Sequence, residues 1–291
     1  MKPFERGILS SFDFKHTAVK IGYTILCLVV GLIILSMLYP FVNTFFNSLK
    51  TTEEFFAFPT PFFPKHWLWS NYKEAVTIIP LLTFLKNTLM IFIGTASFAL
   101  LFIGMASFAL SHLHVPFKKW VTLFFLSTMM IPSATYLIPN YLNLQELGLL
   151  NTYWAFWLPA GANAFYLLLM KSFFDDIHKE LFEAARIDGA SEFQCFVRLA
   201  IPLAKPIIMT LLIFYFSNTW NDFYWPSLVM LDKSMYPLAT GIYRYVIYPG
   251  STIQWNVKFA ILMLVMAPPL VFFLTFQKYI TRGLNVSGVK G

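Results

Sequence analysis

The sequence has 291 residues, of which 58% are hydrophobic and 12% are charged, and its formal net charge is +7. A soluble domain carries about 25% charged residues, so this composition excludes an ordinary soluble globular protein and indicates a membrane protein. The positive charges cluster in segments between apolar runs, which is typical of membrane topology and argues against nucleic-acid binding.

Six apolar segments are long enough to cross a membrane, because about 20 helical residues span a hydrocarbon core of roughly 30 Å. The sequence therefore predicts an all-α membrane protein with six transmembrane helices in a single transmembrane domain, residues 1–291. The fifth span contains Asp222, which must lie near an interface or inside the helix bundle. The spans are predicted at about residues 21–49, 85–111, 119–140, 149–172, 205–229 and 257–279.

The distribution of Lys and Arg predicts the orientation. With six spans both termini lie on one side, and that side holds fourteen of the 21 Lys and Arg residues. By the positive-inside rule both termini are expected in the cytoplasm. The first apolar run is too long for a cleaved signal peptide and lacks a small-residue cleavage site. Cys27 and Cys195 are expected to be packed thiols, because a disulfide does not persist in a reducing compartment.

Two longer loops are predicted on the external side. The first, about residues 50–80, contains "FAFPTPFFPKHWLW", whose prolines oppose regular helix. Its Trp67 and Trp69 suit a membrane interface, and a partner-binding surface is the alternative. The second loop, about residues 232–257, contains "YPLATGIYRYVIYPGSTIQWN". Its aromatic and amide groups can contact a sugar, or they can lie at the bilayer interface.

The cytoplasmic loop between the fourth and fifth spans, about residues 175–202, has its own structure. "FFDDIHKELFEAARIDGA" predicts an amphipathic helix, and Gly189 fits a left-handed helix stop. Ser191 and Gln194 form a capping box that opens a second short helix, which Pro202 closes. Such a corner indicates a docking element. The apolar positions are expected at Ile177, Leu181, Ala184 and Ala185 in the first helix and at Phe193, Phe196, Val197 and Ala200 in the second.

A polar cluster interrupts the fifth span in "YFSNTWNDFYW". Polar and ionisable residues within a span usually face a bundle interior or a cavity. The candidates for a translocation pathway or gate are Asn218, Trp220, Asn221 and Asp222. The alternative is that Asp222 marks the external end of the helix, which a bend at Pro226 would support.

The sequence shows no candidate catalytic or metal-binding residues. It lacks the Gly-rich phosphate loop of the G-x-x-x-x-G-K-[ST] type, and its five His residues are scattered. We therefore expect no cofactor in this chain and no enzymatic activity of its own.

Several motifs together resemble one family. Glu183-Ala184-Ala185, then Gly189 and Leu199-Ala200-Ile201-Pro202, is similar to the EAA motif of binding-protein-dependent ABC importer permeases. "NSLKTTEEFF", "MMIPSATYLIPNYLNLQELGLLNT", "WNDFYWPSL" and the tail "GLNVSGVKG" resemble the maltose-type carbohydrate branch of that family, so the resemblance covers nearly the whole chain. His178 stands where many members have Pro.

The resemblance implies a cytoplasmic coupling helix between spans 4 and 5 that docks on an ATP-binding cassette subunit. It also implies that the cytoplasmic tail, residues 280–291, reaches toward the ATPases. The ATPase-coupling residues would be Glu183, Ala184, Ala185, Asp188, Gly189 and Pro202, and the tail residues would be Gly288, Val289, Lys290 and Gly291.

The implied assembly is a carbohydrate importer in a bacterial cytoplasmic (inner) membrane. Its partners would be a second homologous permease, two ATP-binding cassette subunits that bind ATP and Mg, and an extracytoplasmic solute-binding protein, all surrounded by membrane lipid. The cargo would be an oligosaccharide moved by alternating access. The resemblance extends to importers of acidic polysaccharides such as alginate, and external Lys233 and Arg244 suit either an anionic substrate or lipid headgroups.

Two other classes of protein are alternatives. An ion-coupled secondary transporter requires ionisable groups inside the membrane, and Asp222 alone gives little support for one. A membrane-embedded enzyme requires clustered acids, bases or metal ligands at one depth, and the sequence shows no such cluster.

Overall fold

All the regular structure found in residues 16–285 is helical, as the composition predicts. The computed structural model describes the backbone of residues 16–285 and the side chains of residues 16–277. The tail residues Gly288, Val289, Lys290 and Gly291 lie outside the described residues. The α-helices are α1 (Thr17–Ser48), α2 (Thr52–Phe56), α3 (Ser70–Ile78), α4 (Leu81–His112), α5 (Lys118–Thr128), α6 (Leu137–Glu146), α7 (Trp154–Ala160), α8 (Ala164–Asp175), α9 (Lys179–Ile187), α10 (Glu192–Cys195), α11 (Ile201–Leu203), α12 (Lys205–Asn221), α13 (Tyr224–Val229), α14 (Leu238–Ile242) and α15 (Trp255–Asn285).

The chain divides into two compact units, and α15 contributes to both. One unit comprises residues 1–75 and 253–263, and the other comprises residues 76–252 and 264–291.

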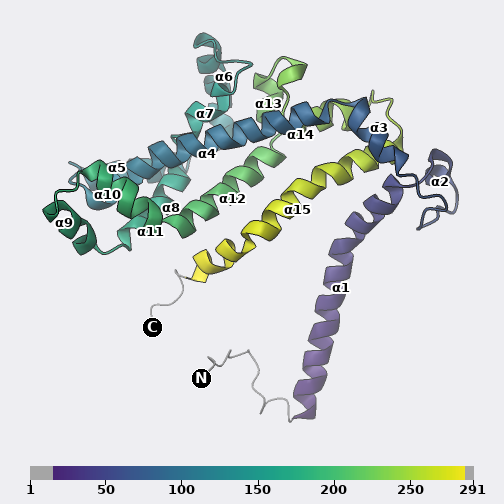
Figure 1. The fold of residues 1–291 in the computed structure, drawn as a ribbon, viewed down its shortest axis with the longest axis horizontal. Helices are drawn as coiled ribbons and strands as arrows, with labels where there is room; N and C mark the ends of the chain where they lie inside the picture. Colours follow the sequence, from purple (N-terminus) through teal and green to yellow (C-terminus); the bar gives the residue numbers. More distant parts are fainter. Residues whose placement is uncertain (1–15, 286–291) are drawn as a thin grey trace. The chain divides into compact units, whose positions relative to one another are not determined.

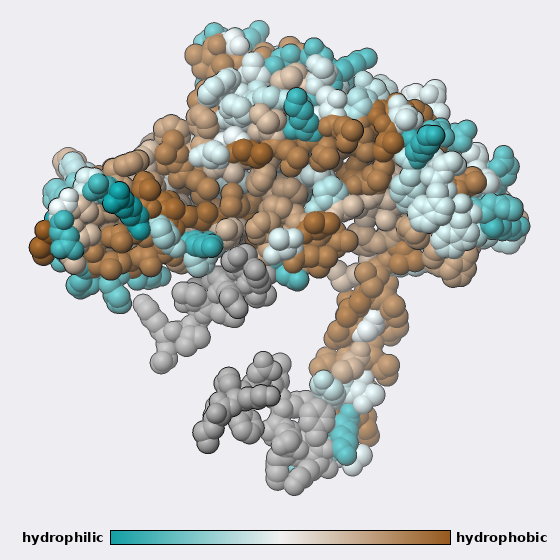
Figure 2. All heavy atoms as spheres, viewed as in Figure 1, coloured by the Kyte–Doolittle hydropathy of each residue, from teal (hydrophilic) through white to brown (hydrophobic). Residues whose placement is uncertain are grey.

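In the first unit, α1 is an apolar helix that is exposed along most of its length. Its 32 residues correspond to about 48 Å of helix, which is more than a membrane core requires. Hydrophobic side chains cover it (Figure 2), and Cys27 lies exposed among them. A helix that is apolar on all sides needs a lipid or protein neighbour.

Amide and lysine side chains organise the first unit beyond α1. Lys50 is buried and donates a hydrogen bond from Nζ to Asn47 Oδ1 at 2.7 Å. Burial lowers the pKa of Lys50 below its ordinary value. Asn71 donates to the carbonyls of Ser48 and Lys50, and its own Oδ1 accepts from Asn256 Nδ2 at 3.2 Å. These bonds join the end of α1 to the start of α15.

The loop predicted on the external side at about residues 50–80 is more regular than the sequence predicts. Two short helices, α2 and α3, flank its proline-rich centre. α2 begins with a capping box in which Thr51 accepts from the Glu54 amide and Glu54 accepts from the Thr51 amide. The prolines lie between the two helices, so they interrupt neither of them, and capping chemistry stabilises the start of α2.

In the second unit, α4 is the central helix. α7, α8, α12 and α14 pack along it (Figure 1). Near its first turn, Asn87 Nδ2 donates to the carbonyls of Ser234 and Tyr236. At its last turn, His112 contacts Phe182 of α9. The loop at residues 232–238 and the α9 region therefore lie at opposite ends of a helix about 48 Å long.

Fewer uninterrupted spans are present than the six predicted. Within residues 16–285, three helices are long and apolar enough to cross a membrane, and the number rises to five if each of two bent pairs forms one span. The bends measure 93° in the pair Lys118–Thr128 with Ser133–Glu146 and 77° in the pair Glu192–Leu203 with Lys205–Asn221. The six-span count, the orientation and the span boundaries remain predictions.

The helix breaks have local causes. α5 and α6 are separated at Pro132, because proline lacks an amide hydrogen and disfavours helix in the preceding residue. The predicted span at residues 149–172 is interrupted between Ala160 and Ala164, where Asn163 accepts from the Tyr166 amide and caps α8. The predicted span at residues 205–229 ends early, at Asn221.

Candidate coupling corner and translocation cavity

The predicted corner in the fourth loop is confirmed. α9 ends at Ile187, and Gly189 follows with φ of +86°. The Ala190 amide donates to the Ala185 carbonyl at 2.9 Å, and the Gly189 amide donates to the Arg186 carbonyl at 3.0 Å. This pair of bonds is a Schellman motif, which favours glycine at the left-handed position.

The second short helix begins with the predicted capping box. Ser191 Oγ accepts from the Gln194 amide, and Gln194 Oε1 accepts from the Ser191 amide. Arg186 donates to Glu192 Oε1 at 2.7 Å and to Oε2 at 3.1 Å, which joins the two helices across the corner. This hydrogen bonding lowers the pKa of the Glu192 carboxyl and raises the pKa of Arg186. The Arg186–Glu192 pair therefore stabilises the folded corner fully at a pH above the ordinary pKa of a glutamate. This stabilisation is lost as the pH falls through the lowered pKa of Glu192.

One buried aromatic side chain anchors the corner to α4. Phe182 is 0% exposed, and its ring lies 4.2 Å from the His112 ring and 5.5 Å from the Phe108 ring, measured between centroids. His112 Nε2 lies 2.8 Å from the Phe174 carbonyl oxygen of α8. Arg186 adds a longer bond from Nη2 to the His112 carbonyl at 3.4 Å. The corner is thus fixed to the ends of α4 and α8.

The predicted apolar stripes are only partly correct. Ile177 and Ala185 pack on the core, but Leu181 and Ala184 are exposed, and the buried anchor is the neighbouring Phe182. In the second segment Cys195, Phe196 and Ala200 are buried, whereas Phe193 is 64% exposed and Val197 is also exposed. Residues Phe196–Ala200 form a π-helical turn, so the spacing of a regular α-helix does not hold along this segment.

The candidate coupling residues lie together on or beside this corner. Glu183, Ala184 and Asp188 are exposed, and Pro202 is exposed on α11. Ile187 at the tip is 87% exposed. We call the exposed apolar side chains of this region, Leu181, Ile187, Phe193 and Val197, the corner face.

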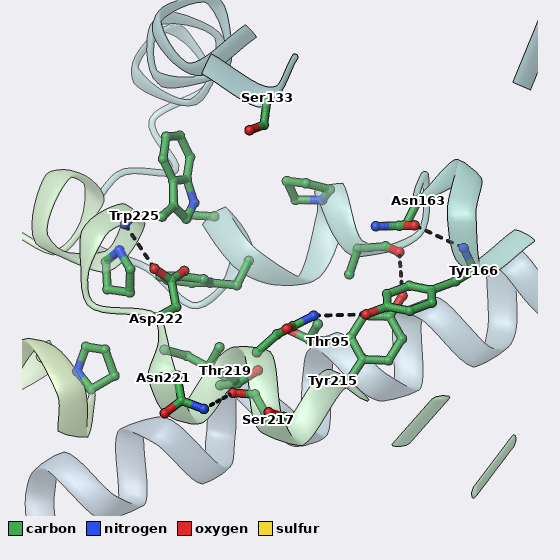
Figure 3. A pocket seen from close by; sticks show the side chains of 18 of the residues that line it. Thr95, Ser133, Asn163, Tyr166, Tyr215, Ser217, Thr219, Asn221, Asp222 and Trp225 are labelled. Atoms are coloured by element: carbon green, nitrogen blue, oxygen red, sulfur yellow. Dashed lines mark hydrogen bonds between the residues drawn. The ribbon is translucent and has the colours of Figure 1, made fainter. Parts of the chain in front are cut away.

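The second candidate site is a cavity in the same unit, among α4, α7, α8, α12 and α13. Its volume is about 810 Å³, within the range of about 300–1,000 Å³ typical of small-molecule pockets. Figure 3 shows Asp222 and Trp225 on one side and Asn163, Tyr166 and Tyr215 on the other. A second cavity of about 990 Å³ shares Ser133, Tyr136, Pro159 and Asn163 with it.

Three of the four predicted pathway residues line the first cavity. Asn218 donates to the Tyr166 hydroxyl at 2.9 Å, and Asn221 donates to the Ser217 carbonyl at 2.8 Å. Asp222 is the C-cap of α12 and accepts from the Trp225 amide at 3.2 Å. It therefore ends the helix, as the alternative interpretation expected, and also lines the cavity.

Trp220 is separated from the other three. It is 6% exposed, stacks on Phe216 at 5.2 Å, and lines a different, apolar cavity with residues of α4 and α15. A helix places residues on different faces within two positions, so Trp220 packs away from the cavity that Asn218, Asn221 and Asp222 line.

Several lining residues were not predicted from the sequence. Thr95 of α4 contributes a buried Oγ1 that has no hydrogen-bond partner, and Tyr215 donates to the Ala160 carbonyl at 3.4 Å. The polar residues within apolar segments were the available signal, but their convergence depends on tertiary packing. The unpredicted polar and aromatic lining residues are Thr95, Ser133, Tyr136, Phe156, Asn163, Tyr166, Tyr215, Ser217, Thr219 and Trp225.

The separation of Asn221 from Trp220 leads to a prediction. Asn221→Ala should change solute uptake at normal levels of assembled protein, because the side chain lines the cavity and is exposed. Trp220→Ala should instead lower the amount of folded protein, because it removes a buried ring. Uptake and detergent-extracted complex are measured in the same membranes. Equal loss of folded complex in both variants would contradict the assignment of Asn221 to the cavity.

Comparison with known proteins finds a matching family model and similar transport proteins. Residues 103–286 match the family model described as "Binding-protein-dependent transport system inner membrane component". Protein LplC of Bacillus subtilis is 30% identical over 87% of this chain and 89% of its own length. The sn-glycerol-3-phosphate transport system permease protein UgpE of Rhizobium meliloti is 30% identical over 89% of this chain and 94% of its own length.

A solved structure has the same fold. One chain in the crystal structure of a bacterial ABC transporter involved in the import of the acidic polysaccharide alginate matches with a TM-score of 0.83 and 24% identity, covering 94% of this chain and 99% of that chain. The family match spans more than half of the sequence and includes the corner, α12 and all of α15. The chain therefore belongs to the family of inner membrane components of binding-protein-dependent transport systems.

Proposed function

We propose that the chain is a permease subunit of an ATP-driven ABC importer that moves an oligosaccharide across the bacterial cytoplasmic (inner) membrane by alternating access. One similar structure supports a saccharide cargo, since it is named for import of the acidic polysaccharide alginate. The observation that carries the proposal is the anchored corner, which presents exposed apolar side chains at the end of the central helix.

The proposed partners follow from this arrangement. An ATP-binding cassette subunit, which binds ATP and Mg, would contact the corner face. It would also contact the coupling residues Glu183, Ala184, Ala185, Asp188, Gly189 and Pro202. A second homologous permease would complete the pathway and the docking sites, so that two cassette subunits are engaged. An extracytoplasmic solute-binding protein would deliver the cargo; a similar structure contains an alginate transporter with an alginate-bound periplasmic protein. The tail residues Gly288 to Gly291 are proposed to approach the cassettes.

The proposed mechanism uses the rigid connection between the two sites. Phe182 contacts α4 through His112, and Thr95 of the same helix lines the cavity. When ATP draws the cassettes together, the corner would move with them and carry α4 and α8. The cavity, lined by α4, α8 and α12, would then open toward the external side.

The central test is reconstitution of the four-subunit importer with its binding protein in proteoliposomes. Uptake of labelled oligosaccharide should require ATP hydrolysis and continue after ionophores collapse the ion gradients. Uptake that follows an ion gradient and ignores ATP would establish a secondary transporter. Chemical conversion of the oligosaccharide without its accumulation would establish an enzyme.

The proposed topology makes a separate prediction, motivated by the excess of Lys and Arg on one side. A reporter active only in the cytoplasm should be active when fused after Gly291 or within residues 175–200, and silent at residues 60 and 245. Activity at residue 60 would contradict the predicted orientation. Membrane content of each fusion, measured by blot, is the control.

A further inference from the structure

Within residues 16–277, the wall of the first cavity carries no cationic side chain, although two similar proteins are named for anionic solutes, sn-glycerol-3-phosphate and alginate. Among the described residues that line the first cavity, Asp222 is the single acidic side chain, and no Lys, Arg or His is present. The residues that line the adjoining cavity include no charged side chain. This wall therefore offers an anion no ion-pair partner from the described part of the chain.

Asp222 makes the wall unfavourable for an anion. Its carboxylate caps α13 by accepting from the Trp225 amide and lies on the cavity side of α12 (Figure 3). A carboxylate accepts hydrogen bonds and repels uronate or phosphate groups. Sites that bind carboxylates or phosphates usually present Arg or Lys instead.

The neutral groups of the wall suit hydroxylated ligands. Thr95 Oγ1 is buried with no hydrogen-bond partner, and the Ser217, Asn218 and Thr219 side chains line the same space. Sugar hydroxyls both donate and accept hydrogen bonds, so they match hydroxyl and amide side chains. The faces of Tyr166 and Trp225 supply apolar surface next to these polar groups.

The basic residues of the predicted external loop at about residues 232–257 do not supply positive charge to the cavity wall. Lys233 and Arg244 are exposed and line neither cavity. They can attract anions at the surface, but they add no positive charge to the walls of the two cavities.

We propose that this chain's side of the translocation pathway is selective for neutral glycans over uronate oligosaccharides and sugar phosphates. This inference rests on the proposed function and specifies its substrate class. It predicts a substrate class that differs from the solutes for which two similar proteins are named, alginate and sn-glycerol-3-phosphate.

The first test identifies the cargo without assuming a particular sugar. Proteoliposomes holding the complete importer and its binding protein receive oligosaccharides hydrolysed from starch, cellulose, mannan and galactan, mixed with the same oligosaccharides oxidised at C6 to carboxylates. Mass spectrometry of the vesicle contents gives the ratio of neutral to acidic species. We expect neutral species to exceed their acidic counterparts by at least about tenfold, since placing like charges together is costly.

The second test changes the wall itself. Asn221→Lys puts a cation on the cavity, and Ser234→Lys puts one on an exposed residue that lines neither cavity. Asn221→Lys should lower the neutral-to-acidic uptake ratio by about tenfold or more, whereas Ser234→Lys should leave it unchanged. A ratio that is unaffected by Asn221→Lys would overturn the assignment of this wall to the pathway.

The outcomes separate this inference from the proposed function. Preferred or equal uptake of acidic oligosaccharides by the wild type would overturn neutral selectivity and leave the oligosaccharide importer standing. ATP-dependent uptake of a solute that is not a saccharide, with every saccharide excluded, would overturn both.

Discussion

Replacing Phe182 by Ala is expected to detach the coupling corner from the membrane helices and to abolish ATP-driven uptake. Phe182 is fully buried against Phe108 and His112. Removing a buried phenylalanine ring costs about 3–5 kcal/mol, and about 3 kcal/mol lowers the ratio of docked to undocked corner roughly 100-fold. The long spans do not depend on this ring, so the two permeases should still assemble.

The measurement is ATP hydrolysis and oligosaccharide uptake in the same proteoliposomes, with cassette content checked by gel. Phe182→Leu is the matched control, because it keeps most of the buried volume and should cost less than about 1.5 kcal/mol. Wild-type uptake per ATP in Phe182→Ala would contradict the role of Phe182 as the anchor. Loss of the whole complex would show that the ring supports the bundle instead.

Gly189→Val is expected to produce the second large effect through the backbone alone. Gly189 has φ of +86°, and no atom lies within 4 Å of an added Cβ. The added Cβ therefore meets no atom beyond the adjacent residues, and the cost comes from the left-handed conformation, about 1–2 kcal/mol and more for a β-branched residue. Relief of this strain would change the angle between α9 and α10 and misalign the corner face. The variant should assemble with its partner permease but lose cassettes or hydrolyse ATP without uptake.

The chain contains a matched control glycine. Gly148 also has a positive φ, +66°, and no atom lies within 4 Å of an added Cβ there. Gly148→Val therefore introduces the same type of strain away from the corner and should leave uptake per ATP near the wild-type value. Gly189→Asn should be tolerated, because Asn adopts the left-handed conformation more readily, and Gly189→Ala should be milder than Val. Equal defects in Gly148→Val and Gly189→Val would show a general loss of stability.

Local chemistry explains which parts of the corner could be predicted. Gly189 and the Ser191–Gln194 pair act through bonds within a few residues, so their patterns are visible in the sequence. The buried anchor could not be predicted in the same way, because adjacent Leu181 and Phe182 are both apolar. The choice between them depends on the position of His112, which is distant in sequence.

The membrane helices also have some features that the sequence predicts and others that depend on local breaks and tertiary packing. Composition predicts how much of the chain is apolar, and α1, α4 and α15 include the predicted spans at residues 21–49, 85–111 and 257–279 almost completely. The breaks near Pro132 and Asn163 interrupt two others, since an apolar run does not reveal where a proline or a cap ends a helix within it. The cavity was least predictable, because it requires α4, α8 and α12 to meet.

Photo-cross-linking from the tip of the corner tests the central claim most directly. p-Benzoylphenylalanine would replace Ile187, which is 87% exposed on the corner. In a control it would replace Leu231, which is exposed and lies three residues before Ser234, whose carbonyl accepts from Asn87 near the other end of α4. Irradiation of membranes holding the complete importer should join position 187 to an ATP-binding cassette subunit, with a yield that changes on adding ATP, and should not join position 231 to it. A cassette cross-link from position 231 with none from position 187 would contradict the account.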